Sequence, residues 1–152
     1  MHEIILTKND KILLFRLLLL VYTRFTEIYE LRASNTNVEV TKTVTFDNYN
    51  NVVYVLEKLV KIVLPRWRLQ TYSQASNMCT VKFIRAAQLS ADDYDKDDYY
   101  IIQAIDRLVQ HSEYAIILPG IKDQELAMRK IESLMYFIQQ PYNVIINFQD
   151  CT

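Results

Sequence analysis

Hydrophobic and polar residues follow two different periods along this chain, and the changes of period predict where helices and strands lie. Residues 12–32 carry apolar side chains around most of a helical wheel, with the polar residues confined to one narrow strip. This pattern predicts a long helix buried in the core. A short β-prone run at 3–7 precedes it, and Asn9 or Asp10 is placed to cap the helix.

The next segment, 38–46, alternates apolar and polar residues and predicts a half-buried strand. A second helix follows, capped by Asp47 or by an asparagine after it. This helix ends just before Pro65, because proline disfavours helical geometry in the preceding residue. Two further alternating runs, 66–72 and 78–84, are separated by a polar loop and predict a β-hairpin.

Beyond the hairpin the same criteria predict two more helices and two more strands. They are a helix at 99–111, a strand at 114–118, a helix between 123 and 141, and a strand at 142–148. Asp123 can cap the last helix and Pro141 stops it. Pro119 and Gly120 suit the two central positions of a type II turn.

The order of elements predicts the fold class. From 38 to 118 the order is β-α-β-β-α-β, which is that of the ferredoxin-like split βαβ arrangement. A buried helix precedes this core, and a helix and a strand follow it. We therefore expect one α+β domain over 1–152, with a mixed or antiparallel sheet of about five strands covered by about four helices.

Glycine is scarce, because Gly120 is the only one in 152 residues. Phosphate-cradling loops and dinucleotide folds need glycines where the backbone approaches the ligand, so neither motif is present. Abundant tyrosine, isoleucine and asparagine together with scarce glycine indicate an AT-rich coding sequence. This composition suggests the hypothesis of a viral accessory or virion protein.

The cysteines and the first apolar run indicate in which cellular compartment the protein acts. Cys79 and Cys151 give no disulfide framework and no metal-ligand spacing, and Cys79 lies in an alternating run that predicts a buried thiol. A reducing intracellular compartment, cytoplasmic or nuclear and in a host cell if the protein is viral, fits best. The apolar run 12–22 is interrupted by Arg16 and is too short to span a membrane.

The segment 58–85 is the strongest candidate for a binding surface. It has no acidic residue, and three large aromatic residues lie between its charges. Its basic residues are Lys58, Lys61, Arg66, Arg68, Lys82 and Arg85. In a strand, Arg66 and Arg68 would lie on the outer face and Trp67 would point inward.

The acidic segment 92–98 follows directly. Its alternating aspartates suggest a calcium loop, but Asp98 stands where such a loop needs glycine and Ala104 stands where it needs glutamate. The alternative is that these acids lie at the positive end of a helix dipole. A small hydrolase or nuclease that uses the aspartates with a divalent metal is a minor alternative. We assign no catalytic, cofactor-binding or metal-binding residue.

Our first functional hypothesis is a non-enzymatic interaction or structural protein that acts through protein–protein contacts, including self-association. The expected partner-binding residues are Arg66, Trp67, Arg68, Lys82, Arg85, Asp95 and Asp97. The basic hairpin of one copy would dock on the acidic segment of the next. The alternative is a nucleic-acid-binding module that uses 58–85, with cations for phosphates and rings for unstacked bases. A net charge of −1 and the lack of an RNP1 pattern argue against this alternative.

Overall fold

The computed structural model describes residues 5–30, 38–73, 75, 77–85, 96–141 and 144–149. Within these residues the protein has four helices and five strands and belongs to the α+β class, as expected. The elements are α1 (Lys8–Glu30), β1 (Val38–Thr45), α2 (Tyr49–Val63), β2 (Arg68–Ser73), β3 (Met78–Arg85), α3 (Lys96–His111), β4 (Ala115–Pro119), α4 (Gln124–Phe137) and β5 (Ile145–Gln149). No helix in these ranges is long and apolar enough to cross a membrane.

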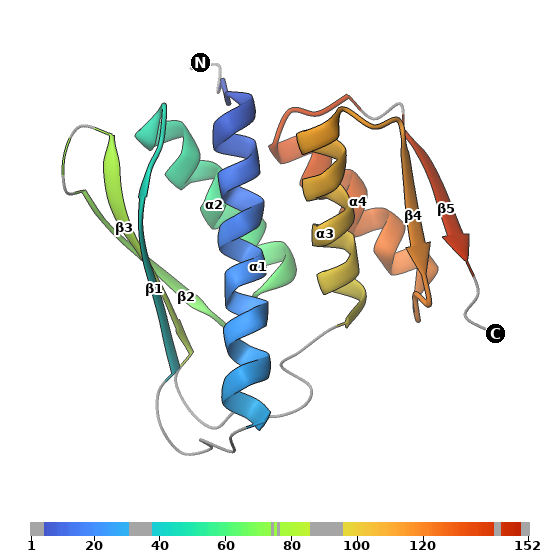
Figure 1. The fold of residues 1–152 in the computed structure, drawn as a ribbon, viewed down its shortest axis with the longest axis horizontal. Coiled ribbons are helices and arrows are strands. Elements are labelled where there is room, and N and C mark those ends of the chain that lie inside the picture. The colour runs from blue at the N-terminus through green and yellow to red at the C-terminus, as the bar shows by residue number, and fades with distance from the viewer. Residues whose placement is uncertain are drawn as a thin grey trace.

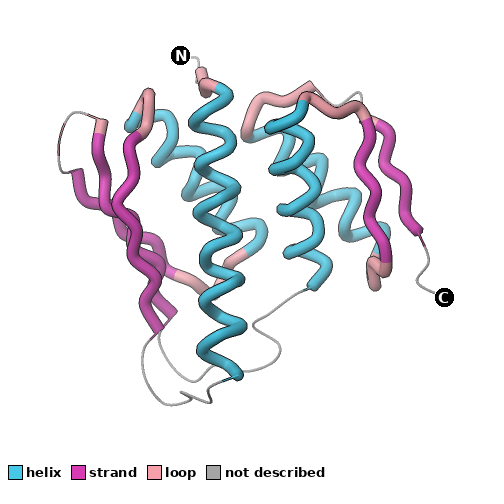
Figure 2. Tube along the Cα trace, in the orientation of Figure 1, coloured by secondary structure: helices cyan, strands magenta, loops and turns pink. Residues whose placement is uncertain are grey.

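The strands form two sheets at opposite ends of the molecule, with the helices between them (Figure 1, Figure 2). One sheet has the order β1-β3-β2, and the other is the pair β4-β5. The prediction of one sheet of about five strands was therefore wrong. Helix α1 contacts α2 and β1, and α3 packs mainly on α1. β4, which follows α3, pairs with β5 and not with a strand of the three-stranded sheet.

The three-stranded sheet and α2 form the β-α-β-β part of the expected ferredoxin-like core. β3 lies in the centre and is antiparallel to both neighbours, while α2 connects β1 to β2 across it. The predicted hairpin is confirmed, with Arg68 opposite Ile84. Along β3, Val81 and Phe83 are buried against the helices, while Lys82 between them lies on the other face.

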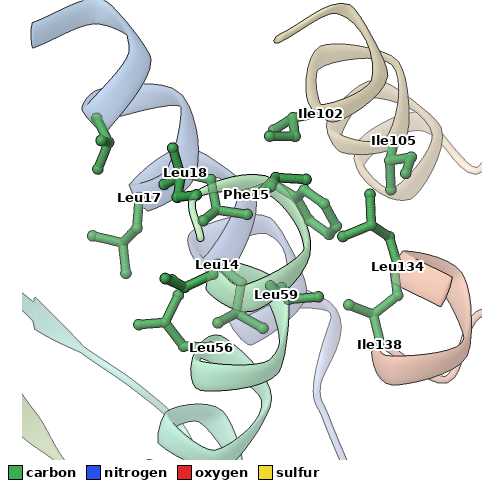
Figure 3. Close-up of a cluster of buried hydrophobic side chains, with 14 of the residues drawn as sticks. Leu14, Phe15, Leu17, Leu18, Leu56, Leu59, Ile102, Ile105, Leu134 and Ile138 are labelled. Carbon is green, nitrogen blue, oxygen red and sulfur yellow. The ribbon is translucent and has the colours of Figure 1, made fainter. Parts of the chain in front are cut away.

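The core lies mainly between the helices (Figure 3), and α1 is central to it, as its apolar pattern predicted. Fully or almost fully buried side chains from all four helices meet there. They include Leu14, Phe15, Leu17, Leu18, Leu56, Leu59, Ile102, Ile105, Leu134 and Ile138. Each such side chain contributes about 1.5–3 kcal/mol relative to an exposed one. The same cluster of buried residues extends to side chains of both sheets.

The beginning of the chain differs from the prediction. Residues 5–7 form no strand, and residues 3 and 4 of the expected run lie outside the described residues. The Thr7 hydroxyl instead accepts a hydrogen bond from the Asp10 amide at 3.1 Å, so Thr7 caps α1. The Asp10 carboxylate is free to accept bonds from the amides of Asp47 at 2.8 Å and Asn48 at 3.1 Å, just before α2.

Local signals set most other helix ends. Asn48 and Asp123 cap α2 and α4 through their side chains, as their positions predicted.

Pro141 does not stop α4, however, because the helix already ends at Phe137 and Gln139 takes a left-handed conformation with φ 58°. The Gln140 amide then donates to the Met135 carbonyl, which completes a Schellman-type end.

Candidate protein interface

The outer face of the three-stranded sheet is the candidate interface. The helices lie on one side of this sheet, and no described element covers the other side (Figure 1). The strand register and the alternation of side chains define the residues of this outer sheet face. They are Glu39, Thr41, Thr43 and Thr45 on β1, Arg68, Gln70 and Tyr72 on β2, and Met78, Thr80, Lys82 and Ile84 on β3.

Lys82 is the central cation of the outer sheet face, and it is paired. Its Nζ lies 3.0 Å from Glu39 Oε1 and 5.5 Å from the centre of the Tyr72 ring. The hydrogen bond between the two charged groups raises the pKa of Lys82 and lowers the pKa of Glu39. This pairing offsets the charge of Lys82, so the middle of the outer sheet face is polar without being strongly positive.

Several other polar side chains of this face form hydrogen bonds with one another. Thr43 and Thr80 share a hydrogen bond of 2.9 Å between their hydroxyl oxygens, and the Tyr72 hydroxyl donates to Gln70 Oε1 at 2.8 Å. The Tyr72 side chain nevertheless stays 46% exposed, and Met78 at the far end of β3 is 40% exposed. The face therefore offers two sizeable apolar surfaces beside satisfied polar groups.

The arginines gather at one end of the sheet. Arg66 lies in the turn between α2 and β2, and Arg68 begins β2. The register places Arg68 opposite Ile84 on the outer sheet face, whereas Arg85, the next residue of β3, lies on the helix side of the sheet. The other two cations of the predicted basic segment lie on α2, behind the sheet, where Lys58 Nζ lies 5.2 Å from the Tyr54 ring. The six cations are thus divided between two sides of the sheet.

Two aromatic residues of the basic segment are buried. Trp67 is 6% exposed and Phe83 is 1% exposed, so both belong to the core. Trp67 was expected among the partner-binding residues, but its buried ring has no face for a partner, and we leave it out of the candidate interface. Tyr72 is the aromatic residue of this segment that lies on the surface.

The acidic segment is used differently from the expectation. Asp95 lies outside the described residues. The Asp97 carboxylate accepts hydrogen bonds from the amides of Lys122 at 3.0 and 3.1 Å and of Asp123 at 3.0 Å, so it tethers the segment before α4 to the start of α3. Asp98 is 4% exposed and binds Lys130. Both carboxylates thus have partners within the molecule, which weakens the idea that they dock on another copy.

The side chains that could take part in catalysis lie on different elements of the structure. Cys79 is buried, and burial raises the pKa of its thiol, which disfavours the nucleophilic thiolate. His111 is exposed at the end of α3. Within the described ranges, no group of three or more histidine, cysteine or acidic side chains is arranged to hold a metal ion.

Among the described residues, three carboxylates are buried although the sequence did not indicate it: Asp10, Asp98 and Asp106. Each lies on an amphipathic helix, and helical spacing alone gives no sign that a neighbouring helix will cover an acid. Burial raises the pKa of Asp10 and of Asp106. These groups lie apart on α1 and α3, and each has a partner in the fold rather than an opening to a site.

Comparisons with known protein families, with characterised proteins and with solved structures found no match to this chain. The residues themselves therefore carry the functional interpretation.

Proposed function

We propose that this chain is a non-enzymatic interaction protein that binds a protein partner through the outer sheet face and the arginines at its end. The observation that carries the proposal is the combination of residues on one uncovered face: Arg68, Tyr72 and Met78 are all exposed there. Arginine, tyrosine and methionine are enriched in protein interfaces, whereas lysine and acids are depleted. The ion pair between Lys82 and Glu39 compensates the two opposite charges in the middle of this face.

Nucleic acid is the alternative partner, and the same face supports it less well. Single-stranded bases need exposed rings on which to stack, and phosphates need uncompensated cations. Burial of Trp67 and Phe83 leaves Tyr72 as the ring for stacking from this segment. Lys82, which would contact phosphate, is paired with Glu39.

The raised pKa of the Cys79 thiol, which disfavours the nucleophilic thiolate, supports the non-enzymatic part of the proposal. The protein would act in a reducing intracellular compartment, where a free buried thiol persists.

Crosslinking and mass spectrometry of the tagged protein in cells that express it would test the proposal. The test variant is Arg68→Glu with Tyr72→Ala. The matched control is Arg107→Glu with Tyr136→Ala, which changes the same residue types at exposed positions of α3 and α4. We expect a partner that crosslinks to the wild type and to the control, and whose recovery falls at least about tenfold with the test variant.

Equal recovery with both variants would show that the outer sheet face is not the interface. A titration with single-stranded oligonucleotides at low and high salt tests the alternative. Salt-dependent binding that is lost in Arg66→Glu with Arg68→Glu would favour the nucleic-acid-binding module instead.

A further inference from the structure

The two-stranded sheet leaves an apolar face uncovered. β4 and β5 are parallel, with Ile117 opposite Asn147. Ile116 and Leu118 of β4 are buried toward the helices, while Ile117 is 56% exposed and Ile145 is 70% exposed on the other side. Parallel strands are found almost only in sheets that are buried on both faces. An exposed parallel pair with apolar residues on its outer face is therefore unusual.

β5 also has an edge that no described strand pairs with. It is the outermost strand, beyond β4 as seen from the helices (Figure 1). The Ile145 amide donates to the Tyr114 carbonyl at 3.0 Å, and the Gln149 carbonyl accepts from the Gly120 amide at 2.9 Å. In a parallel ladder these bonds direct the backbone groups of alternate residues toward β4. The backbone groups of Ile146 and Phe148 consequently point to the other edge.

This edge lacks the features that normally prevent strand pairing. Its sequence, Ile-Ile-Asn-Phe-Gln, has no charge, no proline and no glycine. The free edge of β4 ends in Pro119, which has no amide hydrogen to donate. The edge strands of the other sheet carry charges, with Lys42 exposed on β1 and Arg68 exposed on β2. Proteins use such charges and prolines to block edge pairing, so β5 is the open edge among the strands that the structure describes.

We propose that β5 pairs with β5 of a second copy, antiparallel, about a two-fold axis that passes beside Asn147. Ile146 then lies opposite Phe148 of the second copy, and each of these residues exchanges two backbone hydrogen bonds with its partner. Asn147 faces Asn147 of the second copy, and Ile145 faces Gln149 of the second copy. All five residues of β5 are paired, and the two small sheets become one sheet of four strands.

The sequence of β5 indicates that the strand which pairs with its free edge is β5 of a second copy. Ile146 and Phe148 lie on the inner side and are half-buried in one copy, so antiparallel pairing sets an isoleucine against an aromatic ring twice, a favourable cross-strand pair. No like charges meet, because the strand has none. This inference goes beyond the proposed function, because it adds a second contact, with another copy of the chain, through the sheet at the opposite end of the molecule.

Two variants of opposite charge provide the test. Asn147→Asp and Asn147→Lys each place like charges directly opposite one another at the two-fold axis, whereas a mixture of the two pairs opposite charges. By sedimentation analysis at low salt we expect a wild-type dimer, about fivefold weaker homodimers of each variant, and recovery in the mixture. Asn50→Asp and Asn50→Lys, at an exposed position of α2, are the matched controls and should dimerise as the wild type does.

Amide hydrogen exchange gives a residue-specific second readout that needs no variant. The amides of Ile146 and Phe148 should become protected as the protein concentration rises, while those of Ile145 and Asn147 should be protected at every concentration by β4. A wild-type protein that stays monomeric at high concentration would overturn the inference, as would Asn147 variants that associate like the wild type.

The two proposals fail separately. A monomer that still crosslinks to a foreign partner through Arg68 and Tyr72 would overturn the β5 pairing and leave the proposed function standing. Dimerisation that is abolished by Arg68→Glu with Tyr72→Ala would place self-association on the other sheet, and would again overturn the β5 pairing.

Discussion

Lys130 Nζ on α4 lies 2.8 Å and 3.1 Å from the two carboxylate oxygens of Asp98 on α3. Asp98 belongs to a run of acids, a pattern that is typical of an exposed segment, yet it is 4% exposed. The ammonium group compensates the buried carboxylate and joins the two helices that carry β4 and β5. This ion pair therefore joins the two helices that precede the strands of the smaller sheet.

Removal of Lys130 should destabilise the protein strongly. In Lys130→Met the Asp98 carboxylate remains buried without its ammonium partner, and such losses cost about 3–5 kcal/mol. Urea unfolding would measure the change. Lys122→Met, at an exposed lysine, is the matched control and should change the free energy of unfolding by less than about 0.5 kcal/mol.

The double variant Lys130→Met with Asp98→Asn should recover part of this loss, because it removes the buried charge as well. If Lys130→Met alone behaved like Lys122→Met, the ion pair would have no structural role.

Asp106 should give the protein a defined pH dependence. Burial raises the pKa of this carboxyl above its ordinary value, while Arg16, whose Nε lies 3.4 Å away, and His111 oppose the rise. A raised folded-state pKa means that the folded protein binds the proton more tightly than the unfolded chain does. The contribution to stability is thus complete below the unfolded pKa of about 3.9 and is lost as the pH rises through the folded-state pKa.

Asp106→Asn isolates this effect. The stability of the wild type relative to Asp106→Asn should fall as the pH rises above about 3 and through the raised folded-state pKa of Asp106. Denaturant unfolding of both proteins across this range measures the difference. A difference that is constant with pH, or that rises with it, would contradict the raised pKa.

Gln139 should be replaceable by glycine with a gain in stability. It holds φ 58° at the end of α4, a conformation that costs residues with a Cβ roughly 1 kcal/mol and glycine almost nothing. Thermal unfolding of Gln139→Gly should therefore show a gain of up to about 1 kcal/mol. Gln103→Gly, inside α3, should instead lose about 1 kcal/mol, and equal effects of the two changes would refute the explanation.

Asp97 should contribute to stability through its bonds to the segment before α4. Asp97→Ala removes the acceptor for the Lys122 and Asp123 amides and should cost about 1–2 kcal/mol in urea unfolding. Asp97→Asn keeps one acceptor oxygen and should cost less. An Asp97→Ala protein with unchanged stability but weaker partner binding would restore the original expectation that Asp97 is an interface residue.

Local sequence patterns determined most of the elements of this protein. Helical periodicity predicted α2, α3 and α4, and alternation predicted β1, the hairpin and the inward direction of Trp67 and Phe83. The caps at Asn48 and Asp123 could also be predicted from the sequence, because a capping side chain accepts a hydrogen bond from an amide two or three residues away. These features depend on neighbours in the chain, so the sequence alone defines them.

Tertiary structure decided the rest. Alternation shows which face of a strand is buried but not which strand lies beside it, so it could not predict that β4 pairs with β5 in a separate sheet. The same reason explains the candidate sites. Strand register placed Arg68 opposite Ile84 and left β5 with an edge that no described strand pairs with, and helix packing buried Asp98 beside Lys130. Each of these contacts joins residues far apart in the chain, whose proximity is set by packing rather than by local spacing.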